Sequence, residues 1–263
     1  MSSRKEQREQ ARAEREQREA AEAAKAQRKK RLLRVGGVLV AAVVIVVIAV
    51  VVSSGGSKTG GSSKGSASGA SQASQLLNGI PQSGITLGNP KAPVTLIEFA
   101  DLQCPFCRQY TADTFPTVVA KYVRSGKVKM QFRNYAFIGP DSVTAARAAE
   151  AAGLQNKLWQ FIDVFYANQG TENTDYVTDK FLQKIGKGVD GLNVQKLLTD
   201  RANPKVDQAI SLAQQEAQTA GVNSTPSFLL QKGSAPAKKV SASPFEPAKF
   251  TAEIDAALAG SGG

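Results

Sequence analysis

The chain has 263 residues, with 42% hydrophobic and 21% charged side chains, a net charge of +11 and no histidine. The absence of histidine excludes a Ser-His-Asp triad, an imidazole base and any zinc site built from cysteine and histidine. Twelve lysines and arginines against six glutamates fall in residues 1–34, and the remaining positive charge is scattered without a dense basic stripe, so nucleic-acid binding is not expected.

Residues 1–34 form a charged segment with no apolar stripe that a helix could bury. We therefore expect a solvated cytoplasmic tail that is partly helical or disordered. A coiled-coil or partner-binding helix is the alternative, but no heptad pattern supports it. The basic end of this segment would lie against anionic lipid headgroups.

The stretch VGGVLVAAVVIVVIAVVV, residues 35–52, has eighteen residues and no charge. As a helix it would be about 27 Å long, close to the thickness of the hydrocarbon core of a bilayer. A cleaved signal peptide usually has a shorter apolar core, of about 7–15 residues. We therefore expect an uncleaved transmembrane signal-anchor helix, with the N-terminus in the cytoplasm and everything after Val52 outside it.

Residues 53–78 are rich in glycine and serine and are expected to form a flexible linker. The remaining 79–260 are long enough for one domain with a well-buried core. The predicted organisation is therefore a tail, one membrane helix, a linker and one extracytoplasmic domain.

The domain is predicted to begin with a strand, APVTLIEFAD, whose nearly continuous apolar run indicates burial on both faces. Apolar residues at helical spacing from Phe115 to Tyr122 predict a helix, which Pro116 should kink. The alternation in VKMQFRNYAF predicts a second, half-buried strand.

An all-helical block is expected at about 140–220, because no convincing strand pattern occurs there. Asn203 and Pro204 make a good N-cap and first-turn pair, and Gly221 a good helix end. The helices of this block are predicted at 142–152, 155–168, 176–186, 191–199 and 204–220.

Two more strands are predicted at 227–231 and 238–242, followed by a closing helix with Phe250, Ile254 and Leu258 on one face. The order of elements gives a parallel strand pair joined by a helix, a later hairpin and a final helix. This order predicts an α/β domain with a central sheet covered on both sides.

The only two cysteines, Cys104 and Cys107, are separated by Pro105 and Phe106. A metal site needs about four ligands, and the chain has no third cysteine and no histidine. A structural disulfide here would close a loop of only four residues and remove little unfolded-chain entropy. A redox-active dithiol is therefore preferred over a metal site and a structural disulfide.

The redox interpretation has a physical basis in the expected position of the pair. Cys104 falls at a strand-to-helix junction, where unpaired N–H groups and the helix dipole favour a thiolate. Cys107, one turn into the helix, should be buried and less reactive. Pro105 suits an early helical position, where its missing N–H costs nothing.

Two stretches resemble signatures of the DsbA-like thiol–disulfide oxidoreductases: GNPKAPVTLIEFADLQCPFC around the cysteines and GVNSTPSFLL near residue 226. The helical block between them resembles the insertion that separates this family from plain thioredoxin. The resemblance covers roughly residues 84–260 and implies a thioredoxin-like central sheet with an inserted all-helical block. It does not cover the tail or the linker.

The resemblance implies roles for four residues of the candidate site. Cys104 would be the accessible nucleophile and Cys107 its buried partner. Pro226 would be a cis-proline facing the disulfide, and Thr225 would offer backbone contacts to a bound substrate. Without the resemblance, Thr225 and Pro226 indicate only an ordinary turn.

Three further residues complete the expected site. Glu98 stands where the family keeps an acidic residue near the buried sulfur, and burial would raise its pKa and suit it to exchange protons with Cys107; a salt bridge to a lysine is the alternative. Pro105 and Phe106 are expected to contact substrate. The best-studied oxidases of the family have histidine where Phe106 stands, so the resemblance implies a less oxidising centre here.

The predicted function is a membrane-anchored, extracytoplasmic disulfide oxidase acting on exported proteins with free cysteines. The resemblance implies reoxidation by a quinone-linked membrane thiol oxidase of the DsbB or vitamin K epoxide reductase type, and no organic cofactor. A reductase or isomerase supplied with electrons through the membrane is the alternative. A non-catalytic binding module on a thioredoxin scaffold is a third possibility, because fold alone does not determine function.

Overall fold

The structure, a computed structural model, describes residues 67–260. The predicted tail, the predicted membrane helix and the first part of the predicted linker lie outside these residues. None of the helices within 67–260 is both long and apolar enough to cross a bilayer. The membrane helix at 35–52 therefore remains a prediction.

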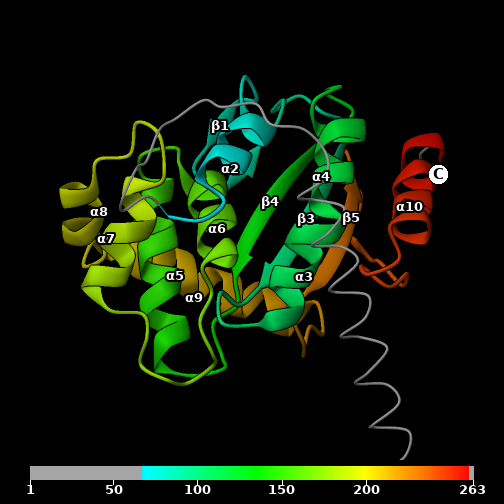
Figure 1. The fold of residues 1–263 in the computed structure, drawn as a ribbon. Helices are drawn as coiled ribbons and strands as arrows, with labels where there is room; N and C mark the ends of the chain where they lie inside the picture. The colour runs from blue at the N-terminus through cyan, green and yellow to red at the C-terminus, as the bar shows by residue number, and fades with distance from the viewer. Residues whose placement is uncertain (1–66, 261–263) are drawn as a thin grey trace, which may run out of the picture. The chain divides into compact units, whose positions relative to one another are not determined.

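The described residues form a mixed sheet with helices packed around it (Figure 1). The π-helical turn η1 continues directly from α4. The elements are, in chain order, α2 (Ala70–Leu77), β1 (Gln82–Ser83), β2 (Thr86–Leu87), β3 (Val94–Ala100), α3 (Pro105–Asp113), α4 (Phe115–Val118), η1 (Val119–Val123), β4 (Val128–Asn134), α5 (Pro140–Gly153), α6 (Leu158–Ala167), α7 (Asp179–Lys187), α8 (Val194–Asp200), α9 (Pro204–Thr219), β5 (Ser227–Lys232), β6 (Lys238–Lys239) and α10 (Pro247–Ala259).

The sheet has the strand order β1-β2-β4-β3-β5-β6. β3 runs parallel to β4 and antiparallel to β5, and β5 pairs with β6 in an antiparallel hairpin. β3 is buried at every position, while β4 alternates between buried and half-buried residues. The predicted parallel pair, the hairpin and the burial of both strands are therefore confirmed. The β1–β2 hairpin was missed, because strands of two residues carry no periodic pattern.

Both faces of the sheet are covered, as predicted. On one face, Tyr110 of α3 and Phe250 of α10 lie against Phe228 of β5, with ring centroids 4.6 and 4.9 Å away. On the other face, Ala217 of α9 packs with Ile97 of β3. The aromatic residues of the core thus lie on the face of the sheet that α3 covers, and the two cysteines stand at the start of that helix.

The five predicted helices of the central block are all present as α5 to α9. Side-chain caps fix the starts of α7, α8 and α9. The Thr178 hydroxyl accepts the N–H of Phe181, so α7 begins three residues later than predicted. The Asn203 side chain accepts the N–H of Lys205 at 3.0 Å, which confirms the predicted start of α9 at Pro204.

The predicted kink at Pro116 is a break. Pro116 has no N–H for the carbonyl four residues earlier, so the helix cannot continue through it. α3 ends at Asp113 and α4 begins at Phe115, and Thr114 between them is distorted, with φ −113° and ψ −39°. The Thr114 hydroxyl donates to the carbonyl oxygen of Pro244 at 2.6 Å, which ties this break to the segment before α10.

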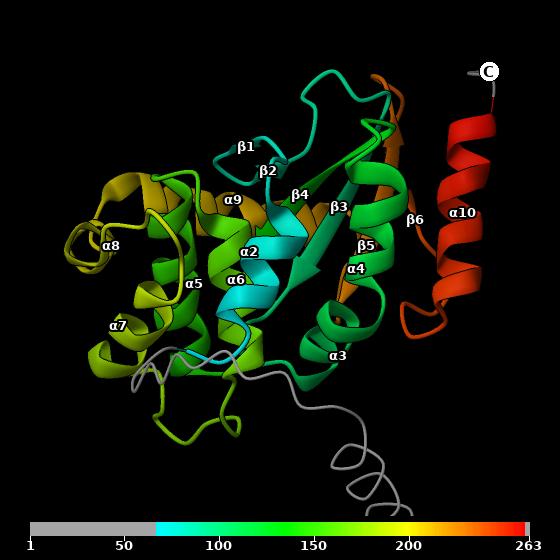
Figure 2. The ribbon, with the colours of Figure 1, turned by 45° about the horizontal axis from the view of Figure 1, so that its top comes forward.

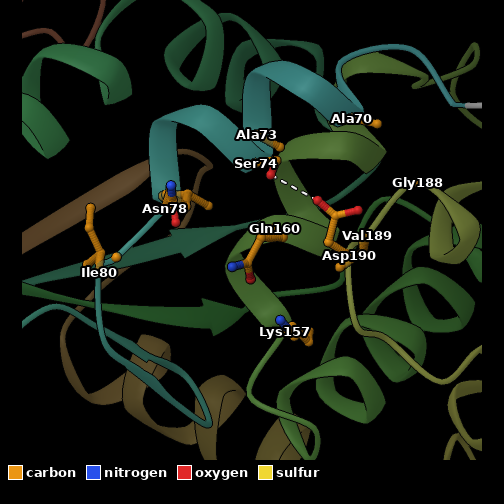
Figure 3. Close-up of a pocket in the computed structure, with 12 residues that line it drawn as sticks. Ala70, Ala73, Ser74, Asn78, Ile80, Lys157, Gln160, Gly188, Val189 and Asp190 are labelled. Carbon is orange, nitrogen blue, oxygen red and sulfur yellow. Dashed lines mark hydrogen bonds between the residues drawn. The ribbon is translucent and has the colours of Figure 1, made fainter.

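Residues 67–78, predicted as linker, are instead part of the folded domain. They contain α2, whose Ala73 and Leu77 are buried one turn apart. The Ser74 hydroxyl donates to Asp190 at 2.9 Å, across a cavity of about 340 Å³ that Lys157 and neighbouring residues also line (Figure 3). The serine- and glutamine-rich sequence shows no clear apolar stripe, because only two side chains of this helix are buried. The helix was therefore not predicted.

Candidate active site

The turn between β3 and α3 places Cys104 at the N-cap of α3. The carbonyl of Asp101, the first residue after β3, accepts the N–H of Cys104 at 2.9 Å. Pro105 takes the first helical position, where its missing N–H costs nothing. The next two N–H groups, of Phe106 and Cys107, help to lower the pKa of the Cys104 thiol. The predicted position at a helix N-terminus is therefore confirmed.

This environment lowers the pKa of the Cys104 thiol to about 6. The largest cause is a hydrogen bond from the side chain of Cys107. The side chain of Thr225 and the two helix N–H groups act in the same direction, and burial opposes them. About nine-tenths of Cys104 is then thiolate at pH 7, and the thiolate is the nucleophilic form.

Cys104 is nearly enclosed, with only 4% of its surface exposed. This corrects the expectation of a freely accessible nucleophile. The cause is the turn before β5, because the carbonyl oxygen of Thr225 lies 3.4 Å from the sulfur and accepts its proton in the thiol form. An incoming sulfur therefore has only a narrow approach to Cys104.

Cys107 lies one turn further along α3 and is completely buried. Burial raises the pKa of its thiol well above the ordinary value, and the negative charges of Cys104 and Glu98 raise it further. Both cysteines are free thiols in this structure. The expectation that the second cysteine is buried is confirmed, and its lower reactivity stays a prediction.

Glu98 lies in the middle of β3 and is 2% exposed. Its neighbours in the sheet register are Phe132 of β4 and Phe228 of β5. Burial among such residues raises the pKa of its carboxyl to about 8. Within residues 67–260 no ion pair involves Glu98, so the alternative of a lysine salt bridge finds no support there.

The Thr225–Pro226 peptide bond is cis, as the resemblance implied. The turn ends at β5, where the Ser227 hydroxyl donates to the carbonyl oxygen of Ser224 at 2.7 Å. Thr225 and Pro226 are half-buried. One side of this turn therefore faces Cys104, and another part of its surface is exposed to solvent.

Pro105 and Phe106 are both exposed, and 57% of the surface of Phe106 is in contact with solvent. The ring of Phe106 lies 5.9 Å from that of Phe245, in the segment before α10. An apolar surface therefore adjoins the enclosed sulfur. The structure thus brings together all seven residues that the sequence singled out.

Sequence reasoning missed three polar residues that hold the redox turn. The carboxylate of Asp101 accepts the N–H groups of Phe137 and Ile138 at 2.9 and 3.1 Å. The buried Gln103 donates to Ser142 of α5 at 2.9 Å and accepts the N–H of Asn173 at 2.8 Å. Gln169, after α6, donates to the carbonyls of Leu102 and Cys104 at 2.8 and 3.1 Å.

These contacts join the redox turn to the helical block. Asp101 stands directly after a buried strand and before the cysteines, which is a usable sequence signal. Gln169 carries no such signal, because its partners are about sixty-five residues away in the chain.

The arrangement suits two-step sulfur chemistry. The pKa of Cys104 is lowered to about 6, which favours its thiolate at neutral pH, and Cys107 is a buried thiol whose pKa is raised by burial and by Cys104. A disulfide can form between them with loss of two electrons and of one proton, from Cys107, and it opens when an external thiolate attacks.

Alkylation of the reduced protein should report the lowered pKa of Cys104. With a small reagent such as iodoacetamide, the rate is expected to be half-maximal at pH about 6 and to change little above pH about 7.5. Enclosure of the sulfur should hold the plateau rate below that of a free thiolate. Mass spectrometry of the modified peptide checks the site; a midpoint near the ordinary cysteine value of about 8.5 would contradict the geometry.

Comparison with known proteins identifies similar chains. A family model described as thioredoxin matches residues 81–248, a range that includes both cysteines. A Bacillus cereus protein named "Probable disulfide bond formation protein D" is 33% identical over 145 residues, which cover 54% of this chain and 67% of that protein.

Solved structures share the fold. The oxidised form of BdbD from Bacillus subtilis superposes with a TM-score of 0.60 at 23% identity, covering 69% of this chain and 98% of that one. A thioredoxin-like oxidoreductase from Silicibacter pomeroyi superposes with a TM-score of 0.54 at 28% identity, covering 72% and 98%. The sheet and the helical block described above are therefore a known architecture.

Proposed function

The chain belongs to the thioredoxin family, is related to disulfide bond formation proteins D and is a thiol–disulfide oxidoreductase, and we propose that it oxidises cysteine pairs in exported proteins through Cys104 and Cys107. The observation that carries this proposal is the position of Cys104 at the N-cap of α3, one turn before the buried thiol of Cys107; the lowered pKa of Cys104 agrees with it. A thiolate that is stable at neutral pH is a good leaving group, which favours release of the reduced enzyme.

The proposed cycle begins with the Cys104–Cys107 disulfide. A substrate thiolate attacks the Cys104 sulfur, forms a mixed disulfide and releases Cys107, which takes up a proton. A second substrate thiolate then attacks the substrate sulfur of the mixed disulfide. The substrate leaves with a new disulfide, and Cys104 leaves as a thiolate. Two electrons have moved from the substrate to the enzyme.

Four residues are proposed to hold the substrate beside the sulfur. Phe106 and Pro105 supply the exposed apolar surface. The half-buried Thr225 and Pro226 supply main-chain groups along the open side of their turn. An unfolded segment with an apolar residue near its cysteine would fit this combination, because it gains apolar contact without needing a defined fold.

Reoxidation requires an electron acceptor. We propose a quinone-linked membrane thiol oxidase of the DsbB or vitamin K epoxide reductase type, since the chain has no third cysteine for an internal relay. We also propose that residues 35–52 anchor the chain with its catalytic domain outside the cytoplasm. The uncharged stretch and the basic residues before it support this topology, and disulfides persist in that compartment.

The redox state of the pair in cells separates the proposed oxidase from a reductase or isomerase. Cells producing the full chain are quenched with acid, and free thiols are tagged with a maleimide that retards the protein in a gel. An oxidase should have Cys104 and Cys107 mainly disulfide-bonded at rest. A mainly reduced pair would instead favour the reductase. Fully reduced and fully oxidised samples of the same chain serve as standards.

A further inference from the structure

The side chain of Tyr110 brings a polar group into the aromatic part of the core. Tyr110 lies three residues after Cys107 in α3, so the two side chains leave the same face of this helix. The residue is fully buried, and within residues 67–260 its hydroxyl has no hydrogen-bond partner. Buried hydroxyls in native proteins nearly always have a partner, so the position of this one calls for a physical explanation.

The sheet places Glu98 close to the same side chain. Glu98 of β3 is directly opposite Phe228 of β5, so both side chains leave the sheet on the same face. The ring of Tyr110 packs on that of Phe228, with the centroids 4.6 Å apart. In Figure 2, α3 accordingly lies next to the end at which β5 begins. Burial, and after it the charge of Glu98, raise the pKa of the Tyr110 phenol well above its ordinary value. The hydroxyl therefore keeps its proton at neutral pH and remains a donor.

Few other polar groups face Glu98. Its two neighbours in the sheet register are phenylalanines, and in the described part of the chain no lysine or arginine pairs with it. Burial raises the pKa of Tyr166 of α6, and the charges of Cys107 and Glu98 add to this effect. The Tyr166 hydroxyl, however, already donates to the carbonyl of Asp101 at 3.2 Å, and the Cys107 thiol donates to the other sulfur. Among these described neighbours, the Tyr110 hydroxyl is thus the donor that is not engaged elsewhere.

The chemistry of the redox pair needs such a donor. Glu98 must be ionised to accept the proton of Cys107. An ionised carboxylate in an apolar core has lost its hydration, and burial for this reason raises the pKa of Glu98 to about 8. A hydrogen bond from a neutral hydroxyl favours the ionised form without adding a second charge to the core. The donor therefore brings the working pH of Glu98 closer to neutral.

We propose that the Tyr110 hydroxyl donates to the ionised carboxylate of Glu98, directly or through one bound water, and so sets the pH at which Cys107 can lose its proton. Tyr110 is thus a positioning residue that acts on the sulfur through Glu98. The inference rests on the proposed function of the Cys104–Cys107 pair and adds a residue to it.

The step concerned is the closure of the disulfide. The proton of Cys107 moves to Glu98, and the Cys107 thiolate attacks the Cys104 sulfur of a mixed disulfide. The Cys104–Cys107 bond forms, and the other partner leaves as a thiolate. In the reverse step, which starts the proposed oxidation, the released Cys107 thiolate takes this proton back.

A substitution that removes only the hydroxyl tests this role. Tyr110→Phe keeps the ring and its contact with Phe228, and loss of an unpartnered buried hydroxyl should not lower the free energy of unfolding. The reduced full chain is mixed with an aromatic disulfide that releases a coloured thiolate. Cys104 attacks this disulfide and releases the first aromatic thiolate. Cys107 then attacks the mixed disulfide at Cys104 and releases the second.

The two releases report the two sulfurs separately. The first depends on Cys104 and should keep a midpoint at pH about 6 in both proteins. The second depends on deprotonation of Cys107, and its midpoint should lie about one pH unit higher in Tyr110→Phe, because a hydrogen bond to a charged group is worth about that much. Below both midpoints the second release should be about tenfold slower in the variant, and above both the two proteins should react at the same rate.

The pH profile separates this role from a structural one. An unmoved midpoint, or a second release slowed by one constant factor at every pH, would overturn the proposal. Tyr122→Phe is the matched control, because this ring is also buried and its hydroxyl donates elsewhere, to Asp255 at 2.8 Å and to the carbonyl of Thr251 at 3.0 Å. The midpoint of the second release should stay unchanged in this control.

Infrared difference spectra of the reduced full chain measure the titration of Glu98 without turnover. The band of its protonated carboxyl is assigned by its loss in Glu98→Gln, and its disappearance with rising pH gives the pKa. Tyr110→Phe should raise that pKa by about one unit, whereas a shift in Tyr166→Phe alone would assign the donor to α6 and overturn the proposal. The spectra do not depend on the direction of electron flow. A pair found reduced in cells would therefore contradict the proposed oxidase and leave the role of Tyr110 standing.

Discussion

Replacing Cys104 with serine is expected to lower the rate of thiol–disulfide exchange at least about a thousandfold. A serine hydroxyl is not ionised at neutral pH and cannot form a disulfide, and thiolate is required for the reaction. Cys107 cannot substitute for it, because this sulfur is fully buried and its pKa lies well above the ordinary value. The measurement is the oxidation rate of a reduced two-cysteine peptide.

Two substitutions at Cys107 sharpen this test. Cys107→Ser and Cys107→Ala both remove the second sulfur, so each should accumulate mixed disulfides that dithiothreitol cleaves. Only serine can still donate a hydrogen bond to Cys104, and that bond is the largest cause of its lowered pKa. The alkylation midpoint should therefore rise clearly in Cys107→Ala and much less in Cys107→Ser. Equal midpoints would show that the helix N-terminus, not Cys107, holds the thiolate.

Replacing Glu98 with glutamine is expected to slow re-formation of the Cys104–Cys107 bond about a hundredfold at pH 8. Cys107 must lose its proton to attack a mixed disulfide at Cys104, and general bases typically contribute about 10²–10⁴. With a pKa of about 8, Glu98 is partly ionised at this pH and lies close enough to Cys107 to influence its titration. Rapid-quench trapping of free thiols measures this step.

The pH profile distinguishes proton transfer from a merely structural effect. In the unaltered protein the rate of bond formation should rise with pH through about 8, where Glu98 ionises. Glu98→Gln should lose this rise while keeping the alkylation midpoint of Cys104 near 6. A variant that is slow by a constant factor at every pH would contradict the proton-transfer role.

The same substitution should change how stability depends on pH. The carboxyl of Glu98 has an ordinary pKa of 4.5 when unfolded and about 8 when folded, so the folded state binds one more proton between these values. Its contribution to stability is full below pH 4.5 and falls by about 1.4 kcal/mol per pH unit up to pH about 8. Urea unfolding measures this effect. Between pH 4.5 and 8, the free energy of unfolding of Glu98→Gln should rise by about 4 kcal/mol relative to that of the unaltered protein.

Much of the fold could be predicted because the relevant signals are local. The alternation in β4 and the continuous apolar run in β3 follow directly from which faces are buried. Asn203 and Pro204 locate the start of α9 through one hydrogen bond within the same turn. α2 escaped prediction, since its stability comes from contacts with α6 and with the segment after α7.

The candidate site divides in the same way. Two cysteines separated by two residues, after a buried strand, indicate a redox pair without any knowledge of the rest of the chain. The enclosure of Cys104 by Thr225 could not be predicted, because it depends on how closely two distant turns approach. Gln169 was missed for the same reason.

Gln103 has a consequence for attempts to simplify this protein. Its wholly buried amide spans the redox turn, α5 and the loop before α7. Excising the helical block to leave a minimal sheet-and-helix scaffold would strand that amide without partners, at a cost of about 1–3 kcal/mol for each lost group. Such a shortened protein would therefore retain both cysteines but lose the hydrogen bonds of Gln103 that hold the redox turn in place.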